Sequence, residues 1–97
     1  MEITEFESDL DNVIVYPNPY LSSKHGCSIF FDRLTENSTI RIFNIAGELV
    51  REIDVQGSPQ SWDTCNESNE KVASGIYIYL IKDSGGNKKV GKLGILR

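Results

Sequence analysis

The chain of 97 residues has little of the chemistry on which most enzymes depend, with one histidine, two cysteines, one tryptophan and one methionine. A single histidine, His25, rules out a zinc site built on two histidines. Ser23, Ser28 and Asp32 stand in no nucleophile-elbow context that would complete a Ser-His-Asp triad. No GxGxxG, P-loop or CxxC motif occurs. We therefore predict a protein that is not an enzyme and uses no cofactor, with His25 in a solvated loop.

Long apolar runs and an excess of basic residues are also missing. No run approaches the roughly 18–20 apolar residues of a membrane-spanning helix. Fourteen Asp and Glu against ten Lys and Arg give a net charge of −4, so we expect neither nucleic-acid binding nor membrane insertion. The first residues, Met-Glu-Ile-Thr-Glu, are acidic where a signal peptide is basic, so a signal peptide of an exported protein is expected further upstream.

The sequence does contain short β-branched and aromatic runs that recur about every 8–12 residues between Gly, Pro, Asn, Asp and Ser. Residues 1–11 are rich in Glu, Asp and Ser and predict an acidic linker or lead-in. Residues 12–97 predict one all-β domain, an immunoglobulin-like or fibronectin-III-like antiparallel β-sandwich of about seven strands. The expected strands are residues 12–16, 28–32, 39–45, 49–55, 60–64, 75–82 and 88–96.

Alternation along these strands predicts the side chains that face the core. Residues 76–81 are apolar on both faces, which predicts a central strand covered on each side, or one with Ile78 and Leu80 beneath another element. The expected inward residues are Ile29 with Phe31, Ile40 with Ile42, Leu49 with Ile53 and Val55, and Leu93 with Ile95.

Proline and glycine mark the connections. Pro17 and Pro19 lack amide donors and have a fixed φ, so they are expected to end the first strand and redirect the chain. Gly47 is free to adopt positive φ and predicts a tight hairpin, and residues 83–87 predict a looser one.

Several residues have a structural and a functional interpretation. Trp62 and the tyrosines Tyr16, Tyr20, Tyr77 and Tyr79 suit either a sugar-stacking platform or core packing, and we favour packing. Cys27 and Cys65 are the only cysteines, and an oxidising compartment would allow one disulfide worth about 3–4 kcal/mol, or leave two thiols. One loop gathers oxygen donors of the kind that calcium uses, although solvated acidic loops are commoner. Its residues are Asp63, Asn66, Glu67, Asn69 and Glu70.

Four segments give a specific resemblance. They are residues 15–19 (VYPNP), 39–50 (TIRIFNIAGELV), Trp62-Asp63 followed by 72–79 (VASGIYIY), and 91–97 (GKLGILR). In order and spacing they resemble the type IX secretion C-terminal sorting domains, and the pattern is similar to the immunoglobulin-like domain of flagellar hook-capping proteins. The family usually has a glycine in the loop before Val72. In this chain the loop has Asn69-Glu70-Lys71 and no glycine. Asn69 is expected to adopt the left-handed conformation that the glycine of the family would adopt.

The resemblance implies a module at the end of a larger secreted bacterial protein, often a hydrolase or adhesin. Such a domain directs its cargo from the periplasm across the outer membrane to the cell surface, and a sortase-like peptidase can then remove it. The expected partners are the secretion machinery or that peptidase, and an upstream cargo domain. The last predicted strand runs almost to Arg97, as expected for a terminal signal.

Recognition is expected to use strand edges and the positive side of the final strand, although these charges also suit an edge protected against aggregation. The residues concerned are Lys88, Lys89, Lys92 and Arg97. One alternative function is a structural immunoglobulin-like spacer of a flagellar hook cap or a cell-surface protein. A third is a carbohydrate-binding module.

Overall fold

A computed structural model describes residues 6–23 and 28–97 of the chain. Within these ranges there are strands and turns but no helix, and none of the described segments is a helix long and apolar enough to cross a membrane. The strands are β1 (Ile14–Tyr16), β2 (Tyr20–Leu21), β3 (Ile29–Asp32), β4 (Ser38–Phe43), β5 (Leu49–Asp54), β6 (Gln60–Trp62), β7 (Gly75–Asp83) and β8 (Lys88–Leu96).

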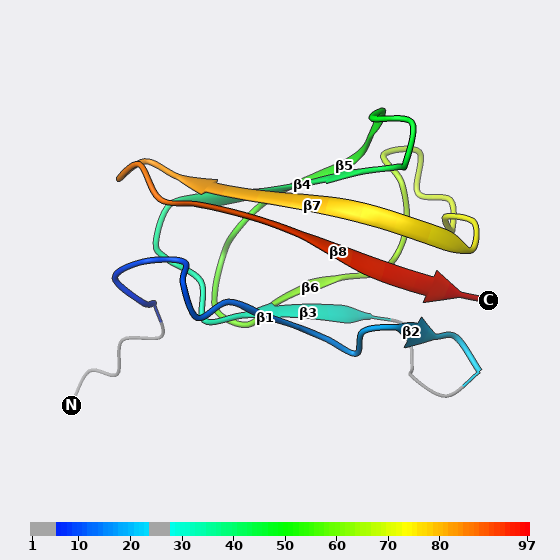
Figure 1. The fold of residues 1–97 in the computed structure, drawn as a ribbon, viewed down its shortest axis with the longest axis horizontal. Coiled ribbons are helices and arrows are strands. Elements are labelled where there is room, and N and C mark those ends of the chain that lie inside the picture. The colour runs from blue at the N-terminus through cyan, green and yellow to red at the C-terminus, as the bar shows by residue number, and fades with distance from the viewer. Residues whose placement is uncertain (1–5, 24–27) are drawn as a thin grey trace.

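The strands form two layers, which Figure 1 shows one above the other. One sheet has the order β1-β3-β6 and the other has the order β2-β8-β7-β4-β5. Every pairing is antiparallel except that of β2 with β8, which is parallel. The predicted all-β sandwich is therefore confirmed, with two sheets facing each other across one core.

The core lies between the sheets and is built by the alternation that the sequence predicted. The ring of Phe31 on β3 meets the ring of Tyr79 on β7 edge to face, with centroids 5.6 Å apart, so aromatic packing joins the two layers. Trp62 is 1% exposed and donates its indole N–H to the Cys65 carbonyl at 2.9 Å. Other core residues are Ile29, Ile40, Ile42, Tyr77, Ile81, Leu93 and Ile95.

The number of strands differs from the prediction of seven because the first strand is split between the sheets. β1 pairs with β3 in one sheet, and β2 pairs with the end of β8 in the other. Pro17 and Pro19 lie between them, so the prolines redirect the chain as predicted. The additional strand is only two residues long, and it is a strand because β8 offers it hydrogen bonds rather than because of a local sequence pattern.

Two predicted core assignments are wrong. A register shift between Ile42 and Phe43 places one extra residue on β5, so that Leu49 is 49% exposed while Val50 packs against the core. The outer face of β7 also has no cover among the described elements. Ile78 and Leu80 are half-buried there, and Ile76 is 50% exposed.

The lead-in was predicted to lie outside the sandwich from residue 1 to residue 11. In its described part, Leu10 is 1% exposed and belongs to the core, and the Glu7 amide donates to the Leu34 carbonyl at 2.8 Å. Residues 6–11 therefore pack on the sandwich, and the exact domain boundary stays a prediction.

Three five-residue loops share one hydrogen-bond pattern, which begins at Asn44, Asn66 and Asp83. In each, the first side chain accepts backbone N–H bonds from the third and fifth residues of the loop. The fourth residue has positive φ in every case: 86° at Gly47, 64° at Asn69 and 94° at Gly86. The predicted turns are confirmed, including the left-handed Asn69 where the related domains have glycine.

Candidate recognition surface on the final strand

The final strand, β8, is bonded unequally along its two edges. One edge pairs with β7 from Lys88 to Ile95. The other edge meets β2 only at its end, where Tyr20 and Leu21 align with Ile95 and Leu96. Among the strands of residues 6–23 and 28–97, none other than β2 covers this second edge, so most of it has no described strand beside it.

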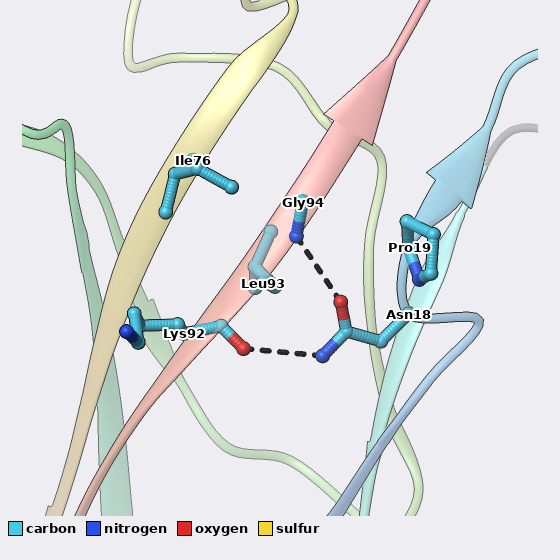
Figure 2. Close-up of a pocket in the computed structure, with 6 residues that line it drawn as sticks. All are labelled: Asn18, Pro19, Ile76, Lys92, Leu93 and Gly94. Atoms are coloured by element: carbon cyan, nitrogen blue, oxygen red, sulfur yellow. Dashed lines mark hydrogen bonds between the residues drawn. The ribbon is translucent and has the colours of Figure 1, made fainter.

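Asn18 takes the place of a strand where the chain crosses between sheets. Its side-chain N–H donates to the Lys92 carbonyl at 3.1 Å, and its side-chain oxygen accepts the Gly94 N–H at 3.1 Å (Figure 2). The amide thus supplies one donor and one acceptor, as a paired backbone residue does. Pro17 and Pro19 predicted a change of chain direction in the sequence analysis, and the role of Asn18 was not identified there. The signal was present, because an asparagine between two prolines carries the only amide N–H groups of the triplet.

The four predicted recognition residues do not lie together. Lys88 and Lys92 are exposed on the outer face of the sheet, whereas Lys89 is half-buried and alternates to the other face. Lys82 on β7 lies directly opposite Lys88. Within the described part of the chain, neither observed ion pair involves any of these lysines. The structure therefore gathers Lys82, Lys88 and Lys92 into one outer cationic group.

Arg97 is held by the domain itself. Its guanidinium donates to the Val72 carbonyl at 2.7 Å and to the Thr64 carbonyl at 3.2 Å, and it lies 5.9 Å from the centroid of the Tyr20 ring. Its backbone N–H donates to the Ser74 hydroxyl at 2.8 Å. These contacts fix the end of β8 to the segment between β6 and β7. The role of Arg97 in partner recognition stays a prediction.

A groove lies on the outer face beside the Asn18 contact. Figure 2 shows the residues that line it, and its volume is about 330 Å³. A second hollow of about 230 Å³ adjoins it and shares Pro19, Ile76 and Gly94 with it. The floor is open because Gly94 has no side chain: a Cβ there would lie 3.5 Å from the Cβ of Pro19 and 3.8 Å from the Cδ1 of Ile76. The walls are mainly apolar, so the groove suits a hydrophobic side chain.

Two tyrosines beneath this strand have perturbed ionisation. Burial raises the pKa of Tyr77, and the nearby Arg97 charge offsets part of that rise. Burial also raises the pKa of Tyr79. The Tyr77 hydroxyl donates to the Ala73 carbonyl at 2.7 Å. Both phenols are therefore neutral at physiological pH, and Tyr77 serves packing and hydrogen bonding while Tyr79 serves packing against Phe31.

The loop with calcium-type donors uses its oxygens on the protein. The Asn66 side-chain oxygen accepts two loop amides, and Glu67 accepts the Glu52 N–H at 2.8 Å. Asp63 accepts the Cys65 N–H and lies 3.9 Å from the Arg51 guanidinium. No cluster of three or more His, Cys, Asp or Glu able to hold a metal ion occurs in residues 6–23 and 28–97. A calcium site at Asp63, Asn66, Glu67, Asn69 and Glu70 stays untested.

The remaining predicted residues are the cysteines, the histidine and the aromatic residues. Cys65 is 6% exposed, but Cys27 and His25 lie outside the described residues, so the disulfide and the solvated histidine stay predictions. Trp62, Tyr20, Tyr77 and Tyr79 are at most 7% exposed, and Tyr16 alone of the five aromatic candidates is 39% exposed. Four of the five rings are therefore core packing, and among the five candidates only Tyr16 has a substantially exposed ring, so they do not form a shared sugar-stacking platform.

The sequence profile of the secretion system C-terminal sorting domain family matches residues 14–95. The chain belongs to this family. The match confirms the resemblance to type IX sorting domains that four motifs in order had predicted. A comparison with curated protein sequences finds no match.

Two solved structures resemble the fold of this sorting domain. PorZ of Porphyromonas gingivalis, described as an essential bacterial surface component of the type IX secretion system, has a TM-score of 0.81 and 24% identity over 93% of this chain. Dimeric latent PorU of the same organism has a TM-score of 0.62 and 23% identity over 87% of this chain. The sorting domain corresponds to 12% of the PorZ chain and 9% of the PorU chain, so it is similar to a small part of each.

Proposed function

We propose that this sorting domain directs a larger bacterial protein, of which it is the C-terminal part, across the outer membrane to the cell surface by type IX secretion. The family match over residues 14–95 is the observation that carries this proposal. The protein it directs would pass through the periplasm and finish on the surface or outside the cell. Its partners are the secretion machinery or a sortase-like peptidase, and the cargo domain upstream in the same chain.

In this proposal the domain acts by being bound and not by catalysis. The large side chains are used as core packing: Tyr79 is buried against Phe31, and Tyr77 and Asp83 have hydrogen-bond partners within the domain. The outer face of β8 instead offers a cationic group and an apolar groove. Both features suit recognition by another protein.

The test is the delivery of a reporter fused upstream of the domain in a bacterium with a type IX system. Deleting residues 91–97 should leave the reporter in the periplasm, but this deletion also removes the buried Leu93 and Ile95. The sharper variant is Lys88→Glu with Lys92→Glu, which changes exposed side chains alone. Its matched control is Lys88→Arg with Lys92→Arg, which changes the same two exposed side chains and keeps both positive charges.

Surface delivery is measured by protease accessibility of the reporter on intact cells, and folding by protease resistance of the domain in lysates. We expect the double variant to lower surface delivery severalfold while it remains folded, with the control unchanged. Normal surface delivery of the reporter by the truncated fusion would contradict the sorting role itself.

A further inference from the structure

The free edge of β8 exposes a short row of backbone hydrogen-bonding groups. The Lys92 carbonyl and the Gly94 N–H point away from β7, toward Asn18. Because backbone groups on a strand repeat their direction every second residue, the N–H and carbonyl of Val90 point the same way. β2 aligns with β8 only from Ile95 onward, and no other described strand pairs with this edge. The edge from Lys88 to the N–H of Lys92, about five residues or roughly 17 Å of strand, is therefore available to a partner, while the Lys92 carbonyl is already bonded to Asn18.

The side chains along this row have a distinct pattern. Val90 is 59% exposed on the outer face, and the exposed Lys88 and Lys92 flank it on the same face. Lys82 lies opposite Lys88. The whole chain is acidic, with a net charge of −4, so this positive group runs against the overall charge. An apolar centre between cationic side chains complements a segment that carries an apolar residue between acidic ones.

The groove at the end of the row adds a place for one more side chain. It opens on the same face, between Pro19 and Ile76, immediately beyond Lys92. Asn18 already occupies the edge at Lys92 and Gly94, so an added strand would end against it. The last side chain of such a strand would lie beside the groove.

We propose that the edge of β8 from Lys88 to Lys92 binds an extended acidic segment of a partner protein as an additional strand, with an apolar side chain in the groove over Gly94. This inference deepens the proposed function by naming the chemistry of the partner, but binding by the isolated chain can be tested without secretion. Main-chain hydrogen bonds to Val90 would supply affinity, and the lysines would select acidic sequences.

A second copy of this chain is a poorer occupant of the same edge. An antiparallel pair centred on Val90 would place Lys88 of one copy opposite Lys92 of the other, on the same face. Like charges directly opposite each other destabilise a strand pair. The lysines therefore disfavour self-association and favour an acidic partner.

The probe is an acetylated and amidated peptide, Thr-Glu-Thr-Val-Thr-Glu-Thr-Phe, which places Glu, Val and Glu on one face of a strand and a phenylalanine at its end. The control peptide has lysine in place of both glutamates. Binding to the 97-residue chain is followed by NMR shifts and by amide exchange. We expect slower exchange at the amides of Val90 and Lys92 with the acidic peptide, and at least about tenfold weaker binding of the basic one.

Two variants connect the binding to the edge. Val90→Pro removes the outward N–H and should weaken binding about tenfold, whereas Val90→Thr retains it and should bind as the parent does. Lys88→Glu with Lys92→Glu should reverse the preference between the two peptides, and this variant keeps the proposal testable if the proline variant does not fold.

The proposal is overturned if millimolar acidic peptide leaves the Val90 amide unchanged, or if the charge-reversed variant keeps the original preference. Protection of Val90 that grows with protein concentration and needs no peptide would overturn it in favour of self-pairing. If the peptide binds as expected but the reporter fails to reach the surface with the intact domain, the sorting role fails and the binding edge stands.

Discussion

Gly91→Ala is expected to destabilise the domain strongly, whereas Gly94→Ala, on the same strand, is not. Gly91 aligns with Tyr79 across the β7–β8 pair, and the tyrosine ring lies over it. A methyl group at Gly91 would overlap the hydroxyl and ring carbons of Tyr79, and it would lie 2.8 Å from the nearer Cε. Because the ring is 7% exposed and packs on Phe31, it has little room to move.

The destabilisation expected for Gly91→Ala has two parts, the overpacking of the core and the loss of the contact between the Tyr79 and Phe31 rings. Overpacking a core side chain destabilises a protein by about 1–3 kcal/mol. Losing the edge-to-face contact with Phe31 adds about 0.5–1.5 kcal/mol. We therefore expect Gly91→Ala to lower the free energy of unfolding by about 2–4 kcal/mol, which for a domain of this size lowers the Tm by roughly 10–20 °C.

Gly94→Ala is the matched control. Its Cβ would make ordinary contacts with Pro19 and Ile76, so its effect should lie between zero and about 1 kcal/mol of stabilisation, since glycine is unfavourable inside a strand. Thermal and urea unfolding of both variants, followed by circular dichroism, measure the difference. Combining Gly91→Ala with Tyr79→Leu should recover at least about 1 kcal/mol relative to the sum of the single changes. Equal Tm losses for the two alanine variants would refute this account.

Two further predictions concern the loops. Asn69→Ala should destabilise the domain by about 1–2 kcal/mol in urea unfolding, because alanine adopts the 64° φ of this position poorly, while Asn69→Gly should stay within about 0.5 kcal/mol of the parent. Burial raises the pKa of Asp83, but hydrogen bonds from Thr35, Asn87 and Gly85 outweigh it and hold the pKa below its usual value. Since the folded pKa is the lower one, this carboxylate contributes stability above about pH 4, which is lost as the pH falls further. Asp83→Asn should flatten this acid limb of the stability curve, and an unchanged limb would contradict the assignment.

The sequence predicted the strands whose signals are local. β8 was placed at residues 88–96 and found at Lys88–Leu96, and β7 was placed at 75–82 and found at Gly75–Asp83. Both are runs of β-forming residues between turn residues. The turn between them is also local, because the Asp83 carboxylate accepts hydrogen bonds from the amides of Gly85 and Asn87. Where local propensity and the final pairing agree, a single sequence is sufficient.

The features that were missed depend on distant parts of the chain. β2 is a strand only because β8 lies beside it, and the bulge at Val50 depends on how β5 meets β4. From the sequence alone, Arg97 was expected to be an exposed charge on the last strand. In the structure its guanidinium donates hydrogen bonds to the carbonyls of Thr64 and Val72. The alternation of side chains along a strand shows which face is buried, but it carries no information on which edge has no neighbouring strand. The contacts of Asn18 with β8, and the unpaired part of the β8 edge beside them, therefore could not be predicted from the sequence.

The two glycines of the final strand show how one short motif serves both the fold and the surface. A spacing of three residues in a strand places Gly91 and Gly94 on opposite faces. Gly91 faces the core and makes room for Tyr79, whereas Gly94 faces outward and forms the floor of the groove. Substitutions should therefore separate the two roles: alanine at Gly91 should destabilise the domain, and alanine at Gly94 should add a methyl group to the floor of the groove without lowering stability. If Gly94→Ala retained full binding of the phenylalanine-ended peptide, the groove would not be part of the recognition surface, even if the free edge of β8 were.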